Sequence, residues 1–250
     1  MEINENRAVF FDCWDTLIRF KADDERWNLR PLYNHCINKD SIDWDQVFSF
    51  LESFIKKYYF SRSLYEIPVE AIHNLVRMNF DILLDCTVEQ TGKEVLSYLN
   101  PEPVDNVSDF LCELEKLSIP YYVLSNTIYP MKETKDVIEK HLPGHKFGFV
   151  LASKDIGVKK PNELFFTTGV HMANKELLNS IYIGDAFFQD VYGSNKAGFN
   201  NSVWLNHKGK KAEVEYERHP GLDKIDYLEV DGYNSLIEIL KDNKLWKTCI

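Results

Sequence analysis

The chain has 250 residues, of which 44% are hydrophobic and 27% are charged, and its formal net charge is -10. A chain of this size can bury a sizeable core and fits one large domain or two smaller ones. Nucleic acid and anionic membranes attract clustered Lys and Arg, so this charge argues against either partner and favours a small-molecule ligand.

The five cysteines are scattered, odd in number and nowhere arranged as CxxC. Such usage suits a reducing compartment better than a disulfide framework or a zinc site. The N-terminal apolar run at residues 8–11 is much shorter than that of a signal peptide, and no later stretch approaches the ~20 apolar residues of a membrane span. We therefore expect a soluble, cytoplasmic protein.

Five short runs of apolar, β-branched or aromatic residues predict buried parallel strands. The runs are residues 8–11, 121–124, 147–151, 181–183 and 202–205. Helical patterns lie at residues 110–117, 131–141, 162–172 and 191–197, and a last one lies at 236–240. The alternation of strand and helix is typical of an α/β fold, and we predict a doubly wound, Rossmann-like parallel sheet as the core.

Residues 20–100 break this alternation, because they show helical spacing and no clear strand. Apolar side chains recur at steps of three and four along residues 44–58, and a second helical pattern covers residues 72–83. We predict an all-helical domain at residues 20–100, inserted into a core domain that consists of residues 1–19 and 101–250.

Asp12 comes directly after the first predicted strand, within the run FDCWDTL. Open parallel sheets bind ligands beyond the carboxyl ends of their strands, which gives this position weight. A single Asp after a strand is nevertheless typical of a turn or cap. The prediction of a site therefore depends on the residue types at the ends of the other strands.

Groups suited to an anion and a metal come after the other strands. The second strand leads into Ser125 and Asn126, whose hydroxyl and backbone amides can hold an anion. The third leads to Lys160, a cation placed just before a helix. The fourth leads to Asp185 and Asp190, two carboxylates on one loop that suit a hard, oxygen-seeking cation. Their joint appearance predicts an active site at this edge of the sheet.

The four segments FDCWDTL, VLSNT, GVKKP and YIGDAFFQD resemble the motifs of the haloacid dehalogenase (HAD)-like hydrolase superfamily. The helical insert lies between the first two motifs, where the C1-capped subgroup of that superfamily carries its cap. The resemblance covers the whole predicted sheet domain. It implies a phosphatase whose cap closes over a small phosphorylated substrate and excludes water.

The resemblance also implies roles for the residues that meet the substrate. Asp12 would be the nucleophile that takes the phosphoryl group and forms an aspartyl-phosphate. Ser125, the amide of Asn126 and Lys160 would hold the phosphoryl oxygens and offset their charge.

The same resemblance implies Mg²⁺ as the cofactor. Asp12, the backbone carbonyl of Trp14 and Asp185 would hold the cation. Asp190 would not contact the cation itself but would orient a metal ligand or a metal-bound water by hydrogen bonding.

One residue departs from the family pattern. Phosphatases of this superfamily usually have a second Asp two residues after the nucleophile, which protonates the leaving group and then activates water, but this chain has Trp14 there. General acid–base help contributes about 10² to 10⁴-fold, so the departure matters. Asp15, where the family commonly has Gly, is the candidate substitute acid.

Two other functions stay open. The first is a 2-haloacid dehalogenase, whose motif also has an aromatic residue after the nucleophile and whose reaction needs no leaving-group proton. Dehalogenases of this kind need no metal, whereas Asp185 and Asp190 are both present here. The second is a weakly active or non-catalytic protein that binds a phosphorylated ligand.

Several side chains of the insert could reach a substrate. Arginines and aromatic residues are the candidates, although each is more often a surface or packing residue. They are Arg26, Arg30, Arg62, Arg77, Trp27 and Tyr65. No pattern among them identifies the substrate.

Overall fold

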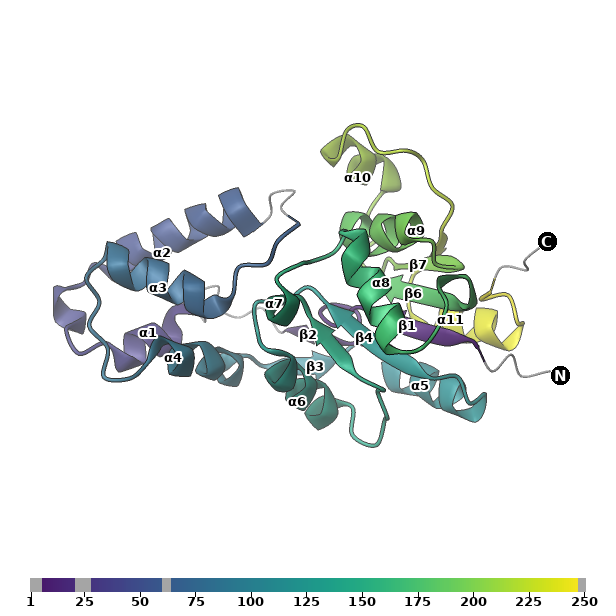
Figure 1. The fold of residues 1–250 in the computed structure, drawn as a ribbon, viewed down its shortest axis with the longest axis horizontal. Helices are drawn as coiled ribbons and strands as arrows, with labels where there is room; N and C mark the ends of the chain where they lie inside the picture. Colours follow the sequence, from purple (N-terminus) through teal and green to yellow (C-terminus); the bar gives the residue numbers. More distant parts are fainter. Residues whose placement is uncertain (1–5, 21–27, 60–63, 247–250) are drawn as a thin grey trace.

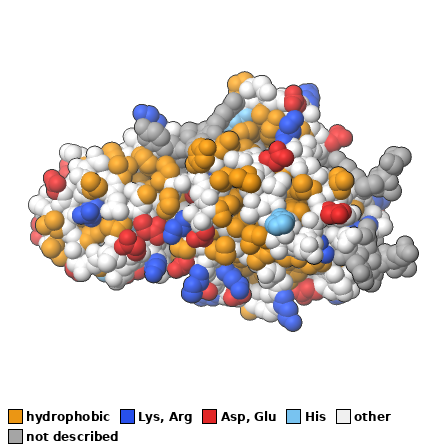
Figure 2. Space-filling model, viewed as in Figure 1, with side chains coloured by type: hydrophobic (Ala, Val, Ile, Leu, Met, Phe, Trp, Pro, Cys, Tyr) orange, Lys and Arg blue, Asp and Glu red, His pale blue; other side chains and the backbone are white. Residues whose placement is uncertain are grey.

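The computed structural model describes residues 6–20, 28–59 and 64–246, so the candidates Arg26, Trp27 and Arg62 lie outside the described residues. Within these ranges, no helix is both long enough and apolar enough to cross a membrane. On the face seen in Figure 2, Lys and Arg side chains lie interspersed with Asp and Glu.

Six parallel strands form one sheet in the order β5-β4-β1-β6-β7-β8. The strands are β1 (Ala8–Phe11), β4 (Tyr121–Ser125), β5 (Val150–Ala152), β6 (Ser180–Gly184), β7 (Asn201–Leu205) and β8 (Leu228–Val230). β1 lies in the centre, with Phe11 opposite Val123 on one side and Ile183 on the other. The loops after β1, β4 and β6 therefore meet at one edge of the sheet.

Helices cover both faces of this sheet (Figure 1). They are α5 (Val107–Lys116), α6 (Met131–His141), α7 (Ser153–Ile156), α8 (Glu163–Met172), α9 (Gly193–Ala197), α10 (Ala212–Arg218) and α11 (Tyr233–Lys241), with helical turns η5 (Leu177–Asn179) and η6 (Phe187–Tyr192). The doubly wound α/β core is thus confirmed.

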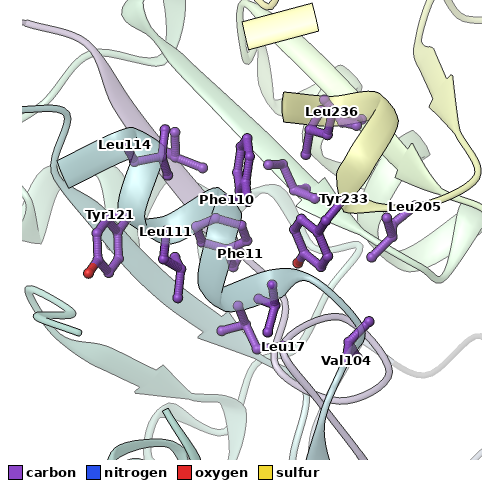
Figure 3. Close-up of a cluster of buried hydrophobic side chains, with 14 of the residues drawn as sticks. Phe11, Leu17, Val104, Phe110, Leu111, Leu114, Tyr121, Leu205, Tyr233 and Leu236 are labelled. Carbon is purple, nitrogen blue, oxygen red and sulfur yellow. The ribbon is translucent and has the colours of Figure 1, made fainter. Parts of the chain in front are cut away.

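Every residue of β1 is buried, because successive side chains point to opposite faces and each face carries helices. Phe11 joins the cluster formed with α5 and α11, where Phe110 and Tyr233 have ring centroids 5.4 Å apart (Figure 3). Phe10 joins the opposite cluster, which includes Phe166 of α8. The strand that carries Asp12 is therefore fixed from both sides.

A separate group of helices lies beside the sheet domain (Figure 1). It comprises α1 (Arg30–His35), α2 (Trp44–Phe54), α3 (Val69–Asn79) and α4 (Val88–Glu94), with the turns η2 (Lys39–Ser41), η3 (Ile55–Tyr59) and η4 (Val95–Tyr98). These helices enclose an apolar cluster of their own, which includes Leu32, Val47 and Val76. The predicted helical cap is present.

A small antiparallel sheet joins the cap to the core. In it β2 (Ile18–Phe20) pairs with β3 (Pro101–Pro103), and Phe20 lies opposite Pro101. The chain leaves the core along β2 and returns along β3. We therefore propose residues 20–100 as the inserted domain.

Some elements differ from the sequence predictions. The patterns did not predict β2, β3, β8 or α10; β3 begins and ends with proline, which is rare in strands, and β8 is a short edge strand. β5 starts at Val150, three residues later than expected. The helix predicted to continue to residue 83 ends at Asn79, because Asp81 takes a left-handed backbone angle, φ 50°.

Candidate active site

Asp12, Lys160 and Asp190 meet in a buried cluster at the carboxyl edge of the sheet. The Lys160 Nζ donates hydrogen bonds to Asp12 Oδ1 and Asp190 Oδ1, each at 2.6 Å, and to the Tyr182 hydroxyl at 2.8 Å. Tyr182 is anchored in turn, since its hydroxyl donates to the carbonyl of Leu124 at 3.0 Å. One ammonium group thus fixes two of the predicted carboxylates.

Asn126 holds the backbone of Lys160 in place. Its Nδ2 donates to the Lys160 carbonyl at 2.9 Å, and its Oδ1 accepts from the Lys160 amide at 2.8 Å. This paired contact joins the end of β4 to the loop before α8. The Asn126 side chain therefore positions the lysine, a role that the sequence did not predict.

The loop after β6 brings two carboxylates together. Asp190 Oδ2 accepts from the Ala186 amide at 2.9 Å. A Cβ atom at Gly184 would lie 2.4 Å from Asp190 Cβ, so this position requires glycine. Carboxylate oxygens of Asp12, Asp185 and Asp190 lie within 4.8 Å of one another. The three form a group that could hold a metal ion.

The ionisation of these carboxyls reflects burial and mutual repulsion. Burial raises the pKa of Asp12 to about 8, with Asp190 and Asp185 adding to the shift and Lys160 opposing it. Burial and Asp190 raise the pKa of Asp185 to about 7. Burial acts to lower the pKa of Lys160, but the charges of Asp12 and Asp190 outweigh it and the pKa rises. A second cation beside Lys160 would relieve the excess negative charge.

Ser125 ends β4 and is fully buried. Within the described part of the chain, its Oγ has no hydrogen-bond partner. A buried hydroxyl without a partner is unfavourable, and a ligand oxygen would remove that cost. The position is consistent with the predicted contact to a phosphoryl group.

Trp14 and Asp15 lie next to Asp12 but face different partners. The Trp14 ring packs against Phe20, with centroids 4.7 Å apart, and edge-on against Tyr129 at 6.3 Å. Asp15 takes a left-handed backbone angle, φ 59°, which glycine adopts most easily. Its Oδ2 accepts from the Lys208 Nζ at 2.6 Å. Asp15 is therefore held in an ion pair.

A cavity of about 500 Å³ lies between the core and the cap. Its core side includes Asp12, Asn126, Asp185 and Asp190, and its cap side includes Asn28, Leu51, Ile55, Ile72 and His73. Ser125 and Lys160 are buried and do not line this cavity, and neither do the cap candidates Arg30, Arg77 and Tyr65. Tyr65 is 69% exposed.

Several hydrogen bonds hold the first residues of α3, and the segment before it, against the core. The Ser153 Oγ donates to Glu66 Oε2 at 2.7 Å, and the Lys154 Nζ donates to Glu70 Oε1 at 2.7 Å. The Val69 amide donates to the carbonyl of Ile128 at 3.2 Å. These contacts place the cap over the edge that carries Asp12.

A model of the haloacid dehalogenase-like hydrolases matches residues 50–203, which is more than half of the chain. The chain belongs to the haloacid dehalogenase-like hydrolase family. The family predicted from the four motifs is therefore confirmed.

This HAD-like hydrolase has curated relatives along almost its whole length. It is 24% identical over 240 residues to a glyceraldehyde 3-phosphate phosphatase of Pyrococcus furiosus, covering 94% of this chain and 93% of that protein. It is 23% identical over 245 residues to a protein of the same name from Methanopyrus kandleri, covering 94% of this chain and 97% of the relative.

Solved structures of HAD-like hydrolases have a similar fold. A HAD phosphatase from Thermococcus onnurineus superposes with a TM-score of 0.64 at 22% identity, covering 94% of this chain and 97% of that one. A 2-haloacid dehalogenase from Pseudomonas syringae pv. Tomato DC3000 gives a TM-score of 0.63 at 18% identity, covering 94% and 98%. Both likenesses show the fold, and the two activities share it.

Some residues of the site in this HAD-like hydrolase were not found from sequence. The Nζ atoms of Lys208 and Lys210 lie 3.9 and 3.8 Å from Asp185 Oδ2. Both lysines come after β7, and ligands bind beyond the carboxyl ends of parallel strands, so their position in the sequence was a usable signal. Tyr182 and His73 lie inside a strand and a helix, where an aromatic or histidine side chain is usually a packing residue.

Proposed function

We propose that this chain is a magnesium-dependent phosphatase that acts on a small phosphorylated metabolite through an aspartyl-phosphate on Asp12. The observation that carries the proposal is the cluster in which Lys160 holds Asp12 and Asp190, with Asp185 close by. The relatives named glyceraldehyde 3-phosphate phosphatase support the same reaction class.

Asp12 would act as the nucleophile. Lys160 holds its Oδ1, which leaves Oδ2 to form a bond to phosphorus while the ester bond to the leaving oxygen breaks. Water then attacks the same phosphorus, the bond to Asp12 breaks, and inorganic phosphate leaves. Ser125 would donate to a phosphoryl oxygen, and the positive charge of Lys160 would offset the negative charge that gathers there.

Magnesium suits the donor set of this edge. Asp12, Asp185 and the backbone carbonyl of Trp14 would hold it, since Mg²⁺ prefers oxygen ligands. Asp190 has both oxygens in hydrogen bonds, to Lys160 and to the Ala186 amide, which fits a supporting role rather than direct ligation. When bound, the cation would offset the charge of the phosphate and allow anionic Asp12 to approach it.

A 2-haloacid dehalogenase is a further candidate, because Trp14 occupies the position of the acid that a phosphatase uses. The three grouped carboxylates weigh against it, since displacement of halide from carbon needs no metal. The similarity to the Pseudomonas syringae enzyme concerns the fold alone.

The experiment that separates the two compares product release. Purified protein is given 4-nitrophenyl phosphate with magnesium, with EDTA, and with EDTA and then excess magnesium; a parallel sample is given 2-chloropropionate. The proposal expects phosphate release that EDTA abolishes and magnesium restores, with no chloride release. Chloride release without phosphate release would replace it with the dehalogenase.

A further inference from the structure

We infer that the alcohol part of the substrate is bulky, apolar and aromatic, rather than a triose or a sugar. This inference rests on the proposed phosphatase function and concerns the part of the substrate that the cap contacts. It depends on three features of the cavity beside Asp12: an aromatic wall, an apolar cap face, and polar groups on the cap side that hydrogen-bond to one another or to Tyr129.

The aromatic wall begins beside the nucleophile. Trp14, two residues after Asp12, packs against Phe20 and Tyr129, and all three line the cavity. A flat aromatic group stacks favourably on such side chains, whereas a hydroxyl group placed against a ring face loses its hydrogen bonds to water. Trp14 therefore gives the leaving group a surface to pack on where a phosphatase of the common pattern has its acid.

The cap face continues this apolar surface. Leu51 and Ile55 come from α2 and η3, and Ile72 comes from α3. No Lys or Arg from the described part of the cap lines the cavity. Lys159 lines the cavity from the core and is only 4% exposed. The negative charge of Glu66 interacts with its ammonium group. The described part of the cap thus offers burial to an apolar group and no cation to a second anionic group.

The polar groups of the cap side are engaged with one another. The His73 Nε2 donates to the carbonyl of Asn28 at 2.9 Å, and its Nδ1 lies 2.8 Å from the Thr91 Oγ1. The Asn28 Oδ1 accepts from the Tyr129 hydroxyl at 3.3 Å. A polyhydroxylated ligand would displace these bonds or bury hydroxyls without partners, and either change is costly.

The size of the cavity agrees with this chemistry. About 500 Å³ lies within the ~300 to 1,000 Å³ range of pockets that bury a drug-sized ligand. A phosphorylated three-carbon compound would leave much of it unfilled, so the apolar cap face would gain little from binding it.

The test keeps every leaving group a primary alcohol and changes what the cap touches. Phosphate release is measured with magnesium for 3-phenylpropyl phosphate, propyl phosphate, glycerol 3-phosphate and glyceraldehyde 3-phosphate, all of which are alkyl esters. We expect kcat/KM for the phenylpropyl ester to exceed each of the others at least tenfold. Equal or higher values for the two polar three-carbon esters would overturn the inference.

A pair of variants tests whether the cavity causes the preference for the phenylpropyl ester. Ile55→Asn changes a half-buried residue that lines it, and Ile42→Asn changes a half-buried isoleucine of the same apolar cluster that does not. We expect Ile55→Asn to reduce the ratio of phenylpropyl to propyl ester at least fivefold, and Ile42→Asn to leave the ratio unchanged. An equal effect of both variants would contradict the role given to the cap face.

The proposed function can fail separately. If no ester, including 4-nitrophenyl phosphate, releases phosphate, the phosphatase reaction itself is wrong. If 4-nitrophenyl phosphate is hydrolysed but the alkyl esters show no preference for the phenyl group, the reaction stands and the substrate inference is overturned.

Discussion

The two walls of the cavity differ in their chemistry and in how they are held together. On the core wall, carboxylate oxygens of Asp12, Asp185 and Asp190 lie within 4.8 Å of one another at the ends of parallel strands, and Lys160 fixes Asp12 and Asp190. The described part of the cap wall presents apolar side chains of short helices, together with Asn28 and His73. On our proposals, the core wall determines the reaction and the cap wall determines which molecule undergoes it. Changes on the two walls should produce different kinds of defect.

Lys160, buried behind the core wall, should give the largest loss of stability. Lys160→Met leaves Asp12 and Asp190 buried without their cation, which costs about 3–5 kcal/mol of stability and at least ~10²-fold in turnover. Lys132→Met, which removes an exposed ion pair with Asp136, should cost less than ~1 kcal/mol. Urea unfolding and kcat on 4-nitrophenyl phosphate measure both. Equal stability of the two variants would show that Lys160 does not hold the site together.

Asp185 should matter for the metal and little for the fold. Asp185→Ala should weaken magnesium binding at least ~100-fold. Loss of a residue that only supports a metal ligand typically lowers metal affinity ~10 to 100-fold, and loss of a direct ligand should lower it further. Asp223→Ala removes an exposed carboxylate that pairs with Lys196 and serves as the control. Calorimetric titration with magnesium gives both affinities. Unchanged affinity in Asp185→Ala would remove this residue from the metal site.

His73 should make the cap sensitive to acid. Burial lowers the pKa of His73 from its ordinary value of 6.5 to about 4. Because the pKa is lower in the folded chain, the unfolded chain binds a proton on this histidine more tightly. The stability that comes from keeping His73 neutral is therefore complete above pH 6.5 and is lost as the pH falls toward 4. Between pH 7 and 4.5 the loss amounts to about 2 kcal/mol, at ~1.4 kcal/mol per pH unit.

The measurement compares unfolding free energies of the native chain and His73→Gln over that pH range. Asp12 and Asp185 titrate in both proteins, so the difference between the two curves isolates His73. His171→Gln, on the exposed end of α8, is the control. A constant difference from pH 7 to 4.5 would contradict a buried, neutral histidine.

Asp15 should give the smallest effect. Its pairing with Lys208 leads us to expect that it does not protonate the leaving oxygen. The rate should then depend steeply on leaving-group basicity across aryl and alkyl phosphates, and Asp15→Asn should change kcat/KM by less than ~3-fold without altering that slope. A shallow slope that steepens in the variant would make Asp15 the acid.

The sequence predicted which residues gather at the sheet edge far better than which residues form the cap wall, for a physical reason. Strands buried on both faces read as short apolar runs, and Asp12, Ser125, Lys160 and Asp185 come after them at the edge where ligands bind. A residue placed by its strand can be found from sequence alone.

The remaining features depend on contacts between distant segments. The apolar spacing of residues 44–58 predicted a helix, but the same spacing serves packing and ligand contact, so Leu51 and Ile55 could not be assigned to the cavity. The pairing of Asp15 with Lys208 joins residues 193 positions apart. The paired hydrogen bonds between the Asn126 side chain and the Lys160 backbone are likewise a tertiary contact.

The central claim is that Asp12 carries the phosphoryl group during turnover. Because Trp14 supplies no base to activate water, hydrolysis of the aspartyl-phosphate should be slow, and 4-nitrophenyl phosphate should give a burst of nitrophenolate close to one equivalent per enzyme.

Acid quenching during the burst and subsequent peptide mass spectrometry locate the phosphoryl group. The account predicts the label on Asp12 in the native chain, and neither label nor burst in Asp12→Asn. Phosphate release at a similar rate by Asp12→Asn, or a label on another residue, would contradict it.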